Sequence, residues 1–283
     1  MTLSVSTLKL LNKLFPQPAH PLNMAQDGTK STAQWQMERG GETLRYFLQA
    51  VSEKELFQDR TVLDMGCGPG GKTCYYGTRG VKKVVGLDLL PDFIAEAQAL
   101  AEQEGLGERV DFVAADATAM PFADETFDVI IANDFMEHVG NPEGALREAH
   151  RVLRKGGRLY VNFPPYYHPY GAHLSDAIAI PWVHRFFSEE TLIQAYKDLV
   201  RAYPDGEKRI AFRFSKDEKG QEYLSYVNGM TIERFEKILQ KTPYLKVAYY
   251  REAPLRDFLA PLSKNPSLRE YLVRMVVVIL EKK

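Results

Sequence analysis

Two kinds of hydrophobic pattern alternate through the middle of the 283-residue chain. Five short segments are apolar on both faces, as parallel strands covered by helices on either side should be. These predicted strands are Thr61–Met65, Lys83–Asp88, Val110–Ala114, Phe127–Asn133 and Arg158–Phe163. Helical patterns lie between them, at Lys72–Thr78, Pro91–Glu104 and Pro142–Val152. Strands alternating with helices predict a parallel sheet with right-handed crossovers.

This alternation stops after Phe163. The following residues, up to about Met230, are dense in Tyr, Phe, His and Pro and include a helical stretch at Ser188–Leu199. A helix and two β-like segments are predicted to close the chain, at Thr231–Gln240, Leu245–Glu252 and Tyr271–Leu280. The sequence therefore predicts an α/β fold in which a doubly wound core carries an aromatic insertion before its last two strands.

The chain divides into three predicted parts. Residues 1–57 form an N-terminal helical cap, because the pattern from Gln34 to Phe57 is helical. Residues 58–163 and 231–283 form the core. Residues 164–230 form an aromatic-rich lid insertion over the edge of the sheet where the parallel strands end.

A glycine-rich loop follows the first predicted strand, which contains Asp64. Its glycines let the backbone turn sharply and approach a ligand closely; they are Gly66, Gly68, Gly70 and Gly71. Three of them also satisfy the dinucleotide fingerprint G-x-G-x-x-G, so an NAD(P)-dependent oxidoreductase is one alternative. Asp64 argues against it, because a carboxylate beside the loop would repel a diphosphate and attract a ligand with ammonium and sulfonium groups.

Five segments, in order and spacing, resemble the motifs of class I S-adenosylmethionine (SAM)-dependent methyltransferases. They are Asp64-x-Gly66-x-Gly68-x-Gly70, Val84–Asp88, Ala114–Ala117, Phe127–Asn133, and Glu137-His138 with Arg151–Gly157. The last is similar to the ubiquinone/menaquinone-biosynthesis-type small-molecule branch. The resemblance is strong over residues 61–162 and weak in the closing strands. It implies SAM as cofactor and a Rossmann-like, mostly parallel seven-stranded sheet with an antiparallel last strand.

The resemblance also implies roles for individual residues. Asp88 would accept hydrogen bonds from both ribose hydroxyls, and Asp116 from the adenine amine, while the Ala117 N–H donates to a ring nitrogen. The other residues of this cofactor site would be Arg39, Asp64, Gly66, Cys67, Gly68, Gly70, Leu89 and Asn133, with Met120 against the base. Other interpretations stay open: Asp64 as a helix cap, Asp88 as a solvated acid, Asp116 as a turn former and Arg39 as a surface residue.

Catalysis of methyl transfer requires little acid–base chemistry, because a sulfonium is already an activated electrophile. Alignment of the nucleophile and exclusion of water supply most of the effect. For a phenol, enol or amine acceptor, a positioned base would add to this. His138, just after the fourth strand, is the first candidate base, and His173 of the insertion is the second. A purely structural role for His138 is the alternative.

The insertion is expected to bind the acceptor. Its aromatic residues indicate a small, partly apolar or aromatic acceptor, with O-methylation favoured over C- or N-methylation; they are Tyr166, Tyr167, Tyr170, Trp182, Phe186 and Phe187. An equal alternative is that these side chains form only the core of the lid. His168, His173 and His184 raise the further possibility of a metal, but their spacing matches no standard metal motif, so no metal site is predicted. Residues 201–221 mix both charge signs and are interpreted as a solvated hairpin or loop.

Composition excludes several classes of function. Lys and Arg number 36 against 37 Asp and Glu, and the formal net charge of −1 argues against dedicated nucleic-acid binding. Two cysteines form no disulfide framework, which fits a reducing compartment. No apolar run is long enough to span a membrane, and no convincing signal peptide is present. We therefore expect a cytoplasmic enzyme, a monomer or homodimer, acting on a small molecule; a SAM-binding regulator without turnover is the remaining alternative.

Overall fold

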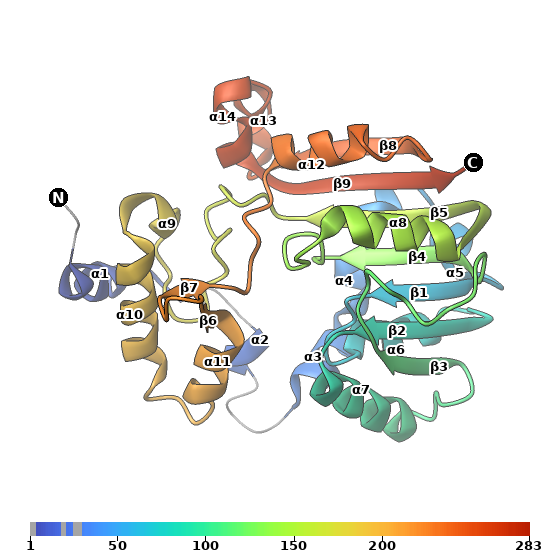
Figure 1. The fold of residues 1–283 in the computed structure, drawn as a ribbon, viewed down its shortest axis with the longest axis horizontal. Coiled ribbons are helices and arrows are strands. Elements are labelled where there is room, and N and C mark those ends of the chain that lie inside the picture. Colours follow the sequence, from blue (N-terminus) through green and yellow to red (C-terminus); the bar gives the residue numbers. More distant parts are fainter. Residues whose placement is uncertain (1–3, 18–20, 25–29) are drawn as a thin grey trace.

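The computed structural model describes residues 4–17, 21–24 and 30–283. Seven strands form one sheet in the order β3-β2-β1-β4-β5-β9-β8 (Figure 1). Their bounds are β1 Thr61–Met65, β2 Lys83–Asp88, β3 Val110–Ala114, β4 Phe127–Asn133, β5 Leu153–Phe163, β8 Leu245–Pro254 and β9 Val273–Lys282. Strand β9 runs antiparallel to both of its neighbours, and all the other neighbouring strands pair in parallel. The predicted doubly wound sheet with an antiparallel last strand is confirmed.

Helices cover both faces of this sheet. Apolar side chains of α8 (Pro142–Val152) and α12 (Ile232–Gln240) pack on one face, in a cluster that includes Leu63 and Ile130. Side chains of α6 (Gly71–Gly77) and α7 (Pro91–Gln103) pack on the other, with Val62 and Val129. Successive strand residues thus point to opposite helical layers, which is why the strands are apolar on both faces.

The predicted N-terminal helical pattern is broken into short pieces in the structure. They are α3 Thr32–Glu38, α4 Gly40–Leu44, the 3₁₀-helix η2 Phe47–Gln49 and α5 Glu53–Phe57. Gly40 lies against Tyr75 so closely that an added Cβ would be 2.2 Å from the ring. Ser52 starts a new helix, because its side chain accepts from the Glu55 N–H while Glu55 bonds back to the Ser52 N–H.

The insertion forms a second lobe beside the strand ends (Figure 1). Its elements are α9 Val183–Phe186, α10 Glu189–Val200, α11 Gly206–Arg213, β6 Phe214–Lys216 and β7 Glu222–Leu224. Helix α1 (Val5–Asn12) packs against α10, and Leu8 is fully buried in the apolar cluster of the insertion. The short helix α2 spans Pro21–Met24. The first helix of the chain therefore packs on the insertion, whereas α3 packs against α6 of the core.

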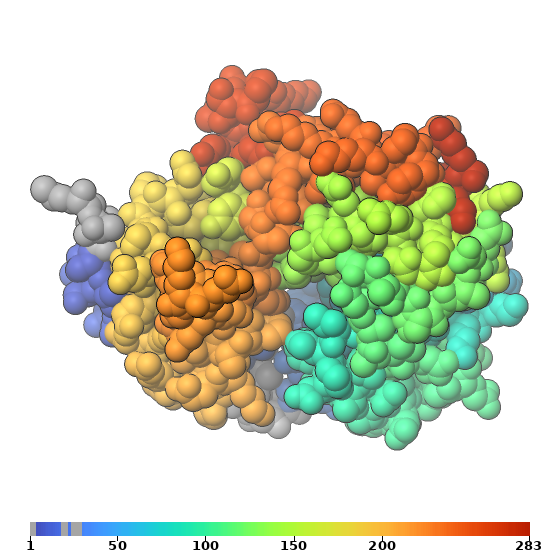
Figure 2. All heavy atoms as spheres, viewed as in Figure 1, coloured from blue at the N-terminus to red at the C-terminus, as the bar shows by residue number. Residues whose placement is uncertain are grey.

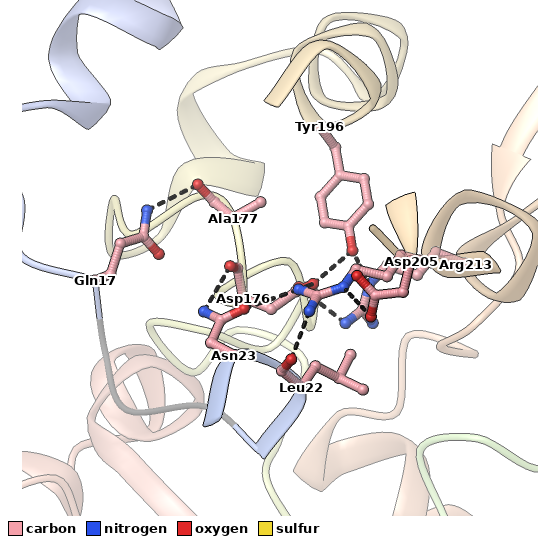
Figure 3. Close-up of polar contacts among 9 residues, drawn as sticks. Gln17, Leu22, Asn23, Asp176, Ala177, Tyr196, Asp205 and Arg213 are labelled. Atoms are coloured by element: carbon pink, nitrogen blue, oxygen red, sulfur yellow. Dashed lines mark hydrogen bonds and ion pairs between the residues drawn. The ribbon is translucent and has the colours of Figure 1, made fainter. Parts of the chain in front are cut away.

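The interpretation of residues 201–221 as a solvated loop is wrong for α11. Arg209 and Arg213 are 3% and 2% exposed, and both pair with the buried carboxylate of Asp176, at 3.1 and 2.8 Å. The Tyr196 hydroxyl donates to the same carboxylate and accepts from Arg213 Nε (Figure 3). The mixed charges suggested a solvated segment, because Asp176, the acid that pairs with both arginines, lies more than 30 residues earlier in the sequence. The turn of the β6–β7 hairpin is exposed as expected.

Three further helical segments precede β9: η3 Asp257–Leu259, α13 Ala260–Ser263 and α14 Pro266–Leu272. Within the described parts of the chain, no helix combines the length and apolar character needed to cross a bilayer.

Candidate cofactor and active site

The glycine loop between β1 and α6 adopts the backbone conformations that only glycine reaches at low cost. Gly66, Gly68 and Gly70 have φ values of 80°, 54° and 80°. A Cβ at Gly66 would lie 2.3 Å from the Phe135 ring, and one at Gly70 would lie 2.3 Å from the Ala97 Cβ. A Cβ at Gly68 would meet nothing within 4 Å. The loop is therefore packed tightly on both sides and open at its tip, where a ligand can approach the backbone.

Asp88 ties this loop to the end of β2. Its Oδ2 accepts from the Gly68 N–H at 2.9 Å, and its Oδ1 accepts from the Leu90 N–H at 3.0 Å. Each carboxylate oxygen keeps a second lone pair, so the carboxylate can still accept from two hydroxyls of a ligand. The half-buried carboxylate lies at the carboxyl end of a parallel strand, beside the glycine loop, where such folds bind their ligands.

Asp64 is buried beneath the loop. It is 2% exposed, and its Oδ2 accepts from the Thr73 hydroxyl at 2.6 Å. Burial raises the pKa of Asp64 to about 6, and the bond from Thr73 opposes this shift. The carboxylate therefore ties β1 to α6, and its charge would act on a ligand through the loop.

The variant Asp64→Asn is expected to stabilise the ligand-free protein at neutral pH. Folding raises the pKa of Asp64 from its usual 3.8 to about 6. The protonated carboxyl therefore contributes stability that is fully present below pH 3.8 and is lost as the pH rises through 6. At ~1.4 kcal/mol per pKa unit, the variant should gain up to about 3 kcal/mol at neutral pH. Chemical denaturation of both proteins across this pH range measures it; a difference in unfolding free energy that does not vary with pH would contradict the expectation.

The residues predicted to hold adenine lie after β2 and β3. Leu89 is 65% exposed beside Asp88, an unusual position for a large apolar side chain, whereas Ala117 and Met120 are buried. Asp116 is exposed, and its Oδ1 accepts from both the N–H and the hydroxyl of Thr118, each at 2.8 Å. Asp116 therefore forms the turn that its sequence favours, and it keeps Oδ2 available to a ligand.

The two cysteines carry no nucleophilic chemistry. Both thiols are buried. Burial raises the pKa of Cys67 well above its usual value and that of Cys74 to about 12. Because a thiol reacts as the thiolate, both are inert at neutral pH, and Cys67 offers the ligand only its backbone.

Helix α3 reaches the start of α6, so the N-terminal region contributes to this site. A Cβ at Gly71 would lie 2.0 Å from the Ala33 carbonyl oxygen and 2.7 Å from the Gln36 Cβ. Gln36 Oε1 is buried and has no hydrogen-bond partner among the described residues. Arg39, at the end of α3, is half exposed; its guanidinium bonds to Glu42 at 3.1 Å and lies over the Trp35 ring. Because Glu42 engages only Nε, the terminal nitrogens of Arg39 are the donors that could bind the carboxylate of the cofactor's methionine moiety.

The segment after β4 closes the other side of the loop. Asn133 is buried, its Nδ2 donates to Asp134 at 3.2 Å, and its Oδ1 has no partner among the described residues. Asp134 has a φ of 53° and also pairs with Lys72 of α6 at 3.4 Å. Phe135 then packs on Gly66. The end of β4 thus lies directly beside the loop predicted to hold the cofactor.

The structure brings the two candidate bases together. The His138 and His173 ring centroids are 4.9 Å apart, and His138 Nε2 lies 3.8 Å from Oε1 of the buried Glu137. His138 Nδ1 is 2.7 Å from the Tyr226 carbonyl oxygen. Burial lowers the pKa of His138, so its ring is neutral at pH 7. Burial and the neighbouring Asp134 raise the pKa of Glu137 well above its usual value.

His168 and His184 do not join His173. His168 Nδ1 accepts from the Tyr170 N–H, and His184 packs against the rings of Tyr166 and Tyr167. Asp176, the nearest acid in the insertion sequence, is held by the two arginines of α11. Among the described residues, ligand atoms grouped closely enough for one metal ion occur at Glu137, His138 and His173 instead. The three-histidine hypothesis from the sequence is therefore wrong.

The insertion lobe faces the carboxyl ends of the parallel strands (Figure 1), and a recess separates it from the core in Figure 2. The segment after β4 bridges the two, because Asn228 donates to the Met136 and Val139 carbonyl oxygens at 2.8 and 2.7 Å. Of the six predicted aromatic residues, Tyr166 and Phe187 line a cavity of about 120 Å³ inside the insertion. Phe186 is 64% exposed. The six therefore do not form one common wall.

Sequence reasoning missed Glu137 and Gln36 as site residues and the Tyr226 carbonyl as a partner of His138. Glu137 stands in the Glu-His pair that carried the resemblance, so a signal for it was present. Gln36 and Tyr226 gave none, because their positions depend on how α3 and the insertion pack against the core.

Comparison with known proteins finds a methyltransferase domain within the chain. Residues 63–161 match the family described as "Methyltransferase domain", the stretch that contains the loop, Asp88, Asp116 and the Glu-His pair. Over these residues the chain is similar to the class I SAM-dependent methyltransferases. SAM is the cofactor of this class, and the open tip of the loop and the free lone pairs of Asp88 are compatible with it.

Two curated methyltransferases illustrate the range of relatives. The chain is 40% identical over 101 residues to the ubiquinone/menaquinone biosynthesis C-methyltransferase UbiE of Roseobacter denitrificans, covering 35% of this chain and 40% of that protein. It is 33% identical over 102 residues to the norajmaline N-methyltransferase of Rauvolfia serpentina, covering 36% and 35%. The chain thus spans little more than a third of the length of these methyltransferase relatives.

A solved structure shares the fold over almost the whole chain. It is the PH0226 protein from Pyrococcus horikoshii OT3, with a TM-score of 0.54 and 18% identity. The match covers 97% of this chain and 99% of that one. The similarity therefore extends beyond the methyltransferase core as fold alone.

Proposed function

We propose that this methyltransferase transfers the methyl group of SAM to a small, partly apolar or aromatic acceptor bound between core and insertion. The observation that carries the proposal is the open tip of the glycine loop beside Asp88, directly next to the Glu137–His138 segment and the insertion. The names of both curated relatives refer to small-molecule chemistry, which supports a small acceptor. The net charge of −1 supports a site that does not bind nucleic acid.

The cofactor would lie across the ends of β1, β2 and β3. Asp88 accepts the ribose hydroxyls, Asp116 and the Ala117 N–H read adenine, and Leu89 covers the base. Glycines 66, 68 and 70, with the backbone of Cys67, line the methionine moiety next to Asn133, and Asp64 attracts its positive charge through the loop. Arg39 binds its carboxylate through the terminal guanidinium nitrogens.

SAM bound in this way supplies a methyl group already activated by its sulfonium. The chain then has to orient the acceptor in line with the carbon–sulfur bond and keep water out. The acceptor's lone pair forms the new bond to the methyl carbon, the bonding electrons stay on sulfur, and the acceptor's proton goes to a base. His138 is a neutral imidazole at pH 7 and can take that proton, which favours a hydroxyl acceptor; His173 is the second candidate.

The division into cap, core and lid belongs to the same proposal. Residues 164–230 close over the acceptor, and residues 1–57 serve both lobes, since α1 packs on the insertion and α3 on the glycine loop. A monomer or homodimer is compatible with this arrangement, because the described chain supplies every group used.

Calorimetry with the purified protein tests the cofactor. SAM and its demethylated product are expected to bind with one-to-one stoichiometry, and NAD is expected not to bind. Binding of NAD without binding of SAM would overturn the proposal in favour of an oxidoreductase.

Methyl transfer from labelled SAM to a panel of phenols, enols and amines tests turnover. We expect a phenol or enol to accept the label and product analysis to place it on oxygen. Tight SAM binding with no transfer to any acceptor class would instead favour the SAM-binding regulator.

A further inference from the structure

The carboxylate of Glu137 is buried without a partner. The residue is 3% exposed, and neither oxygen has a hydrogen-bond partner among the described residues. Burying a carboxylate costs several kcal/mol unless a proton or cation compensates its charge, so native structures rarely leave one in this state. Glu137 therefore requires an occupant that accounts for its charge.

The tautomer of His138 directs a lone pair at this carboxylate. The Tyr226 carbonyl oxygen, 2.7 Å from Nδ1, can only accept, so Nδ1 carries the ring proton. Nε2 then has its lone pair free, 3.8 Å from Glu137 Oε1. Two acceptors that face each other repel unless something positive lies between them. A backbone carbonyl on the far ring nitrogen is also the usual way in which a metal-binding histidine is oriented.

His173 completes the group from the insertion. One ligand atom from each of Glu137, His138 and His173 lies within 4.8 Å of the other two. The His173 φ of 52° is a left-handed conformation that costs a non-glycine residue energy and that concentrates at functional sites. Ligand atoms bound to one tetrahedral zinc ion lie about 3.4 Å apart, so small side-chain rotations suffice for closure.

We propose that Glu137, His138 and His173 bind one divalent transition-metal ion. Two imidazoles and one carboxylate suit Zn²⁺, Fe²⁺ or Co²⁺, and three protein ligands leave a position open. The site lies on the segment after β4 whose Phe135 packs on Gly66, so the open position is beside the predicted methyl donor. Building on the proposed function, the acceptor is a molecule that coordinates through oxygen. With both histidines bound to the metal, neither serves as the base of the proposed function. Coordination instead lowers the pKa of the bound hydroxyl, which loses its proton to water, and orients the resulting oxyanion for methyl transfer.

The competing occupant is a proton shared between Glu137 and His138 Nε2. It would satisfy the same two acceptors, give an acid–base pair in place of a metal site, and leave His173 outside the group. Metal binding by the protein alone separates the two occupants and requires no knowledge of the acceptor.

The 283-residue chain is freed of metal by a chelator and titrated with CoCl₂, and the visible d–d absorption of protein-bound Co²⁺ is followed. One equivalent is expected to bind, and ZnCl₂ is expected to displace it. Removing a residue that only hydrogen-bonds to a metal ligand typically weakens metal binding about 10–100-fold. Glu137→Gln and His173→Gln each replace a ligand itself, so each should lower the Co²⁺ affinity more than about 100-fold. His168→Gln, a histidine of the same insertion outside the group, is the matched control and should bind as the wild type does.

SAM calorimetry on each variant shows whether it is folded and keeps this test separate from that of the proposed function. Variants that bind SAM but have lost Co²⁺ support the metal site. Wild-type protein that binds SAM and takes up no stoichiometric Co²⁺, or a Glu137→Gln variant with unchanged Co²⁺ affinity, would overturn it and leave the shared proton.

Discussion

Replacing Asp176 by Asn is expected to destabilise the insertion by about 3–5 kcal/mol, because it leaves the buried Arg213 guanidinium without its counter-charge and the buried Arg209 guanidinium with only the part-exposed Asp205. Asp176 is fully buried and pairs with both Arg209 and Arg213. Its backbone carbonyl also accepts from Asn23 at 2.9 Å, and Asn23 accepts in turn from Arg209 (Figure 3). The carboxylate therefore links α10 and α11 to the segment that follows β5, and Arg209 extends the network to α2.

Chemical denaturation of wild type and variant measures this loss. Because the insertion has its own apolar cluster, we expect the first part of the transition to move to lower denaturant. Asp198→Asn is the matched control: its partner Lys9 is 40% exposed and the pair, at 3.1 Å, should contribute under about 1 kcal/mol. An Asp176→Asn variant no less stable than this control would show that the network is dispensable.

The same network marks the limit of prediction from the sequence. Strands β1 to β4 were predicted with their observed bounds, because each is a short apolar run that ends at a glycine loop, a turn or an acid that the local sequence reveals. Arg209 has one local partner, Asp205, but the acid that Arg209 and Arg213 share is distant in the sequence. The mixed charges predicted a solvated hairpin or loop, and only the tertiary fold places Asp176 against the face of α11 that carries both arginines.

The candidate site divides in the same way. The loop and Asp88 follow from motifs on neighbouring parallel strands, whose carboxyl ends must meet at one edge of the sheet. His138 and His173 meet only because residues 226–228 tie the insertion to the segment after β4, and no pattern in the sequence specifies that contact. The histidines were grouped wrongly from their closeness in sequence, which does not fix closeness in space.

Asp88→Ala is expected to weaken SAM binding by more than about 100-fold. In the proposed complex the carboxylate accepts from both ribose hydroxyls, and hydrogen bonds to a charged group contribute about 1.5–3 kcal/mol each, or at least about 3 kcal/mol for the pair. The substitution also removes the acceptor that holds the Gly68 N–H. Because Asp88 is only half buried and water can replace its two backbone contacts, the unfolding free energy should change much less than the affinity.

Calorimetry of SAM binding with Asp88→Ala, beside Asp92→Ala as matched control, tests the placement of the cofactor. Asp92 lies one turn further on, exposed in the first turn of α7, so its loss alters the local charge but no predicted contact. Asp116→Ala should fall between them, since Asp116 is exposed and already engaged by Thr118. We expect SAM affinity to fall most for Asp88→Ala and least for Asp92→Ala only if the ribose lies at the end of β2. Equal affinities for Asp88→Ala and Asp92→Ala would mean that the cofactor does not cross that strand end, even in a chain that binds SAM.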